Sequence, residues 1–157
     1  LASSPNNRAP NFRAAAMLMA APMFGARLMP PQIRIIYAIC LAAAIAPHVG
    51  QDSDCLWLFD GPTALYRMTG SCVPTKFVYP DHLNNALEVN ALGVSQVAEV
   101  ARVLATRPGA IVTASSPMTI QNAEATALVE AALERDYVED LSVDMHDRTL
   151  TAWIRRE

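Results

Sequence analysis

Two short, continuously apolar segments predict buried strands within residues 50–157. The first is CLWLF, residues 55–59, followed by the turn Asp60-Gly61-Pro62; the second is AIVTA, residues 110–114, which follows Arg-Pro-Gly. An apolar run of this length between turn-forming residues is typical of a strand with both faces covered. A short helix is predicted over residues 62–69, because proline suits the first turn of a helix and Gly70 can end it.

The remaining patterns predict helices and a hairpin. Asp81 can cap a helix through NNALEVNAL, and Ser95 can cap the next helix. The apolar stripe of that helix is expected to be Val94, Val97, Ala98, Ala101, Leu104 and Ala105, with Gln96, Glu99 and Arg102 outside it. A further helix is predicted over residues 123–134. LSVDM and LTAWIR alternate with period two around a turn, which predicts an antiparallel hairpin. The order of elements predicts an α/β fold: a small domain with a parallel-centred sheet and a C-terminal antiparallel hairpin.

Residues 1–49 have a different character. They open with the polar stretch LASSPNNRAPNFR, which resembles a loop between larger elements and favours a fragment of a longer protein. The apolar run that follows, AAAMLMAAPMFGA, is too short to cross a bilayer, so residues 1–27 are interpreted as a loop and a partial apolar segment. Residues 28–49 have the length for an N-terminal transmembrane helix, provided that Arg34 reaches the headgroups. A buried or interfacial hairpin and an uncleaved signal anchor are the alternatives.

Charge is divided unevenly between these two parts. Residues 1–49 contain four arginines and no acidic residue, whereas residues 50–157 contain eight basic and fifteen acidic residues. The positive-inside rule therefore predicts a cytoplasmic N-terminus and an extracytoplasmic α/β domain over residues 50–157, with the membrane as a partner. The acidic balance of that domain repels phosphate backbones, so nucleic acid is not an expected partner.

The cysteines allow three interpretations. Cys55 and Cys72 flank the first strand and the helix after it, and in an oxidising compartment they would form a disulfide. Two unpaired buried thiols, or one catalytic thiol, are the alternatives, although no histidine lies close to either cysteine in the sequence. Cys40 lies in the apolar run and is interpreted as a small membrane-facing or packing residue.

A candidate ligand-binding edge is formed by Asp60, Asp81 and His82. Asp60 follows the first strand, at the sheet edge where open α/β folds bind ligands, and the Asp81-His82 pair follows a proline in a loop that could return to that edge. A carboxylate near an imidazole can orient a general base or begin a metal site. Alternatively, Asp60 and Asp81 are simply a turn residue and a helix cap. No metal, cofactor or phosphate-binding glycine loop is predicted.

Three stretches together carry a resemblance to a known group of proteins. FDGPTALYRMTGSC, FVYPDHL and EVARVLATRPGAIVTAS follow one another between residues 59 and 115. The sequence over residues 50–115 resembles the C-terminal extracytoplasmic tail of bacterial integral-membrane glycosyltransferases, which transfer sugars from polyprenyl-phosphate donors. The corresponding features are the aromatic-Asp-Gly-Pro turn at residues 59–62, the Pro-x-His-Leu stretch at residues 80–83 and the Glu-Val-x-Arg helix at residues 99–102.

The resemblance implies a location and a role. It places residues 50–157 on the periplasmic side of a bacterial inner membrane, with lipid-linked sugar reached only through the parent protein. In such enzymes the catalytic carboxylates lie in an early extracytoplasmic loop, so this chain is expected to be a non-catalytic C-terminal domain. The alternatives are a membrane-tethered module that binds or assembles a cell-envelope component, and a small tethered enzyme acting at the Asp60–His82 edge.

Overall fold

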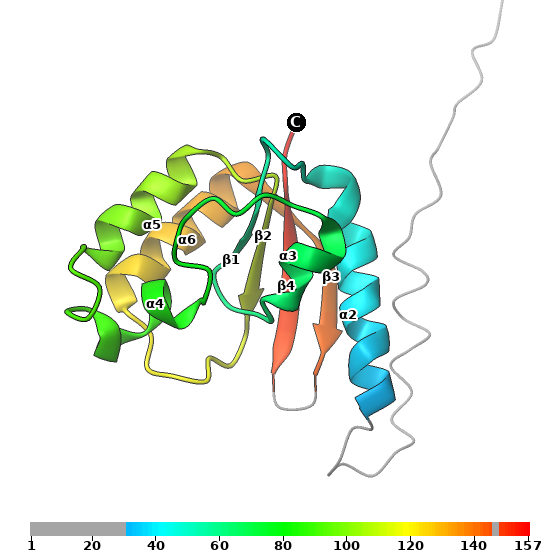
Figure 1. Cartoon of the computed structure of the whole chain (residues 1–157), viewed down its shortest axis with the longest axis horizontal. Coiled ribbons are helices and arrows are strands. Elements are labelled where there is room, and N and C mark those ends of the chain that lie inside the picture. Colours follow the sequence, from blue (N-terminus) through cyan, green and yellow to red (C-terminus); the bar gives the residue numbers. More distant parts are fainter. Residues whose placement is uncertain (1–30, 146–147) are drawn as a thin grey trace, which may run out of the picture.

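The computed structural model describes residues 31–145 and 148–157, which form a sheet with helices on both faces (Figure 1). The four strands are β1 (Leu56–Leu58), β2 (Ala110–Ala114), β3 (Tyr137–Asp144) and β4 (Thr149–Arg155), in the order β1-β2-β4-β3. β1 pairs with β2 in parallel, and the other two pairs are antiparallel. The α/β class and the C-terminal hairpin are therefore confirmed. The parallel pair lies at one side of a mixed sheet rather than at its centre.

Two helix layers enclose this sheet. One consists of α2 (Pro31–Ile45), the 3-10 turn η2 (Ala46–His48) and α3 (Ala64–Thr69). The other consists of α4 (Asp81–Asn84), the 3-10 turn η3 (Ala86–Glu88), α5 (Gln96–Ala105) and α6 (Ala123–Asp136). Figure 1 shows α2 on the opposite side of the sheet from α5 and α6. Each layer closes its own apolar core, one around Leu41, Leu65 and Val112 and the other around Trp57, Val100 and Val129.

The predicted transmembrane helix over residues 28–49 is not what the structure contains. Residues 28–30 lie outside the described residues, and the helix that follows has 15 residues, about 22 Å at 1.5 Å per residue, against about 30 Å of bilayer hydrocarbon. Leu41 and Ile45 are fully buried in the core beneath it. Among residues 31–145 and 148–157, no helix has the length and apolar character needed to span a membrane. The apolar run predicted a transmembrane helix, but part of its apolar character comes from side chains that α2 buries in the protein core.

The other local predictions have mixed outcomes. Ser95 caps α5, its hydroxyl accepting a hydrogen bond from the Ala98 amide, as predicted. Asp81 does not cap α4: it is the first helical residue, after Pro80. The predicted stripe of α5 was also wrong, because the buried residues of this helix are Gln96, Val100 and Val103. The glutamine placed outside the stripe is therefore inside the protein.

Candidate functional site

Asp60 occupies the predicted place at the end of β1, but its carboxylate is already bound. The Asp60 amide donates to the carbonyl of Val112 on β2, which fixes the turn after β1. The Arg148 guanidinium, in the connection between β3 and β4, lies 2.6 Å from Asp60 Oδ1, and the two side chains are only 12% and 11% exposed. The pair ties the first strand to the C-terminal hairpin. Arg148 was missed by the sequence analysis because 88 residues separate it from Asp60.

The electrostatics of Asp60 follow from this burial. Desolvation raises the pKa of Asp60; the nearby Arg148 lowers the pKa by a smaller amount, and the charge of Asp81 raises it further. Asp81 is exposed at the start of α4. The charge of Asp81 therefore has a small effect on Asp60, and a ligand-binding role for the two carboxylates stays a prediction.

His82 points to a different partner. Its Nδ1 lies 2.8 Å from Glu88 Oε2, and the rings of Phe77 and Tyr79 meet the imidazole edge-on, at centroid distances of 6.2 and 5.9 Å. Glu88, from η3, was not among the predicted site residues, and only its proximity in sequence to His82 could have suggested it. Within the described residues no partner of His82 Nε2 is found. If Nδ1 carries the proton and donates it to Glu88, Nε2 is an acceptor, the arrangement of a carboxylate-oriented histidine.

A buried amide network holds the backbone of His82 in place. Gln96, 1% exposed, donates from Nε2 to the carbonyls of His82 and Asn85, each at 2.9 Å, and accepts at Oε1 from Asn122 Nδ2 at 2.8 Å. Asn84, 2% exposed, donates to the Phe59 carbonyl at 2.7 Å. These bonds join α4 to the first turns of α5 and α6 and to the end of β1. In the described part of the chain, the Asn84 Oδ1 atom is the one buried side-chain polar atom without a hydrogen-bond partner.

A hollow of about 720 Å³ lies beside this network. Its lining includes Val89, Gly93, Gln96, Gln121 and Asn122, from the loops that precede α5 and α6. Asn122 caps α6: its Oδ1 accepts hydrogen bonds from the amides of Glu124 and Ala125 and is therefore not free for a ligand. Over residues 31–145 and 148–157, no group of three or more His, Cys, Asp or Glu side chains is arranged to hold a metal ion.

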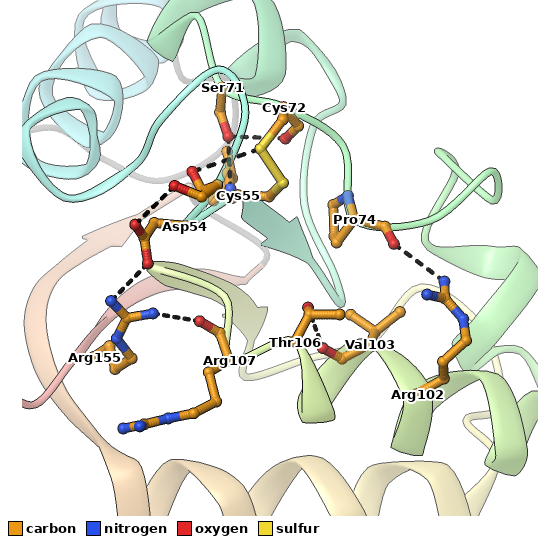
Figure 2. Close-up of a disulfide and its surroundings, with 12 residues drawn as sticks. Asp54, Cys55, Ser71, Cys72, Pro74, Arg102, Val103, Thr106, Arg107 and Arg155 are labelled. Carbon is orange, nitrogen blue, oxygen red and sulfur yellow. Dashed lines mark hydrogen bonds and ion pairs between the residues drawn. A yellow bond between two sulfur atoms is a disulfide. The ribbon is translucent and has the colours of Figure 1, made fainter.

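Cys55 and Cys72 form the predicted disulfide, with Cα atoms 4.8 Å apart (Figure 2). Hydrogen bonds reinforce the same junction: the Ser71 hydroxyl accepts from the Leu56 amide at 2.6 Å, and the Cys72 amide donates to the Gly50 carbonyl at 2.8 Å. The two cysteines are therefore not a reactive pair of thiols. Cys40 is a free, half-buried cysteine on α2.

An ion pair and a hydrogen bond connect the segment before Cys55 to the last strand, β4. Arg155 of β4 pairs with Asp54 at 2.6 Å and also donates to the Arg107 carbonyl, as Figure 2 shows. Asp54 and Arg107 both have positive φ, 54° and 52°, a conformation that costs a non-glycine residue free energy and persists where surrounding contacts impose it. Beside them, a side chain at Gly109 would collide with the His48 carbonyl. The end of the domain that contains the disulfide is thus held by a covalent bond, an ion pair and hydrogen bonds.

The comparisons with known proteins are negative. No protein-family model, curated protein or solved structure matches this chain significantly.

Proposed function

We propose that this chain is a non-catalytic extracytoplasmic domain of a membrane protein of the glycosyltransferase type. The observation that carries the proposal is the Cys55–Cys72 disulfide, since such bonds form and persist in oxidising, extracytoplasmic compartments. It closes a loop within the very stretch that resembles the tails of these enzymes. The contacts of Asp60 also support the proposal, because its carboxylate is bound to the largely buried Arg148 instead of being free to act as a general base.

The experiment tests the parent protein and the isolated chain together. Antibodies against residues 50–157 should precipitate, from solubilised membranes of the source cells, an activity that transfers sugar from a polyprenyl-phosphate donor. The purified chain alone should show no turnover with the same donor, and a precipitate made with unrelated antibodies serves as the control. Turnover by the isolated chain, or an antigen found only in the soluble fraction, would contradict the proposal.

A second candidate function, a module that binds a cell-envelope component, is favoured by the surroundings of His82. Tyr79 is 63% exposed beside a histidine that Glu88 orients, and sugar rings bind to such pairs of an aromatic face and a hydrogen-bonding group. Under this alternative, soluble envelope oligosaccharides should shift the amide resonances of residues 77–88 in NMR titrations. Tyr79→Ser should remove the shifts, whereas Met118→Ser, a substitution of another exposed residue, should leave them unchanged.

A further inference from the structure

The outer surface of α2 is apolar and uncovered within the described structure. Ile35, Ile36 and Ile39 are 60%, 50% and 53% exposed, and Ala43 is exposed further along the helix. Residues three and four apart are neighbours on a helix, so these four side chains form one stripe. The opposite side of α2, with Leu41 and Ile45, is already buried on the sheet. Exposed apolar stripes of this kind mark interaction surfaces.

The helix layer that contains α2 and α3 differs in charge from the rest of the domain. α2 and α3 contain two arginines, Arg34 and Arg67, both exposed, and no acidic residue. The opposite layer holds acidic residues on each of its three α-helices: Asp81 on α4, Glu99 on α5, and Glu124, Glu130, Glu134 and Asp136 on α6. A domain with fifteen acidic residues therefore has one helix layer that is apolar and basic.

We propose that α2 lies on an anionic lipid bilayer, parallel to its surface. Ile35, Ile36 and Ile39 would enter the boundary between headgroups and acyl chains, and Arg34 and Arg67 would contact lipid phosphates. α2 is apolar on both sides, and one side is already occupied by the sheet, so the exposed stripe with Arg34 beside it is the part that can enter the interface, as the apolar face of a surface-bound helix does without spanning the membrane. The inference rests on the proposed function, which locates the domain at a membrane, and adds which face it presents.

The composition of residues 1–30, which precede α2, also favours an anionic bilayer as the surface that α2 contacts. Thirty residues precede α2, and they contain three further arginines, an apolar run of thirteen residues and no acidic residue. Anionic lipids attract such basic segments electrostatically. An anionic bilayer accounts for the isoleucines and for the basic residues beside them together, and a second copy of the domain is distinguished from it by the test below.

The test uses the full chain with a tryptophan introduced on α2. Ile36→Trp is incubated with vesicles of phosphatidylcholine and phosphatidylglycerol whose acyl chains carry bromine, a short-range quencher of tryptophan fluorescence. Its emission, corrected for that of the unsubstituted chain, should fall in these vesicles and should fall less in pure phosphatidylcholine. Leu87→Trp is the matched control, because Leu87 is 80% exposed on the opposite helix layer, and its emission should not change.

Each other outcome has a defined meaning. Flotation of the chain with the vesicles in a density gradient is measured alongside quenching. If the chain floats but the tryptophan at position 36 is not quenched, the assignment of α2 to the bilayer surface is wrong and the membrane location in the proposed function stands. If the chain does not float at all, the assignment of α2 to the bilayer fails, whereas the proposed function, in which the parent protein holds the domain at the membrane, is tested separately by the precipitation experiment. Equal quenching at positions 36 and 87 would indicate unspecific adsorption, and equal quenching in pure phosphatidylcholine would remove the role of the arginines. Blue-shifted emission of Ile36→Trp without vesicles, in a dimer, would assign this face to a second copy.

Discussion

Removing the Cys55–Cys72 bond should destabilise the domain without unfolding it. The two residues are 17 apart in the sequence, and the loop between them contains the whole of β1 and α3. Loop-closure entropy predicts a cost of about 3 kcal/mol for a loop of this size. The fold should survive the loss, because the hydrogen bonds of Ser71 and Cys72 join the same segments, and Leu65 remains buried in the core.

Thermal unfolding followed by circular dichroism measures this cost. A loss of about 3 kcal/mol corresponds to a fall in Tm of about 12 °C for a domain of this size. The double variant Cys55→Ser/Cys72→Ser and the reduced wild type should show the same fall. Cys40→Ser is the matched control, since Cys40 is a half-buried cysteine outside the bond; its Tm should match that of the wild type without reductant and fall by the same amount when reductant is added.

Two results would refute the reasoning. Intact mass after alkylation of the denatured chain should show one modified thiol, that of Cys40, until reductant is added; three modified thiols in unreduced protein from the extracytoplasmic side would mean that the bond is absent. An unchanged Tm on reduction, with the bond present, would mean that the junction is held by its hydrogen bonds and that the entropy of the unfolded chain contributes little.

Three further predictions concern buried or bonded polar groups. Asp60→Asn should destabilise the domain by about 3 kcal/mol in chemical denaturation, because it leaves the largely buried Arg148 charge unpaired. Hydrogen bonds from Arg102 lower the pKa of Glu99 to about 2, so the unfolding free energy should decrease as the pH falls from about 4.5 to about 2, and Glu99→Gln should flatten the curve in that window. Gln96→Leu should cost about 2 kcal/mol and speed hydrogen exchange of the helix starts, since it removes three buried hydrogen bonds.

Each of these has its own control. The double variant Asp60→Asn/Arg148→Met should be more stable than Asp60→Asn alone, because it removes the unpaired charge as well; a less stable double variant would contradict the buried-charge argument. Glu130→Gln, on an exposed site of α6, should leave the pH profile unchanged. If Gln96→Leu is as stable as the wild type, burial of the added apolar group offsets the lost network.

Much of the fold was predictable because the relevant signals are local. The strands around Trp57 and Ile111 are short apolar runs between turns, and Ser95 caps the helix directly after it. Of the candidate edge, the position of Asp60 was predictable, since it follows a strand. Its partner Arg148 was not, because the contact depends on the pairing of β4 with β2, which brings the start of β4 near the end of β1.

The amino-acid sequence by itself determined the α/β class and the C-terminal hairpin, because these depend on patterns of residues close together in the chain, whereas the pairing of Cys55 with Cys72 was one of three interpretations until the structure brought the two cysteines together. Only the tertiary structure decided which side of each helix is buried. The apolar run of α2 has the composition of a membrane helix, but one side of it packs on the sheet, and apolar composition alone cannot distinguish a protein core from lipid. Likewise Gln96 is polar yet buried, because three neighbouring groups from other elements satisfy its amide, and no local pattern records such partners.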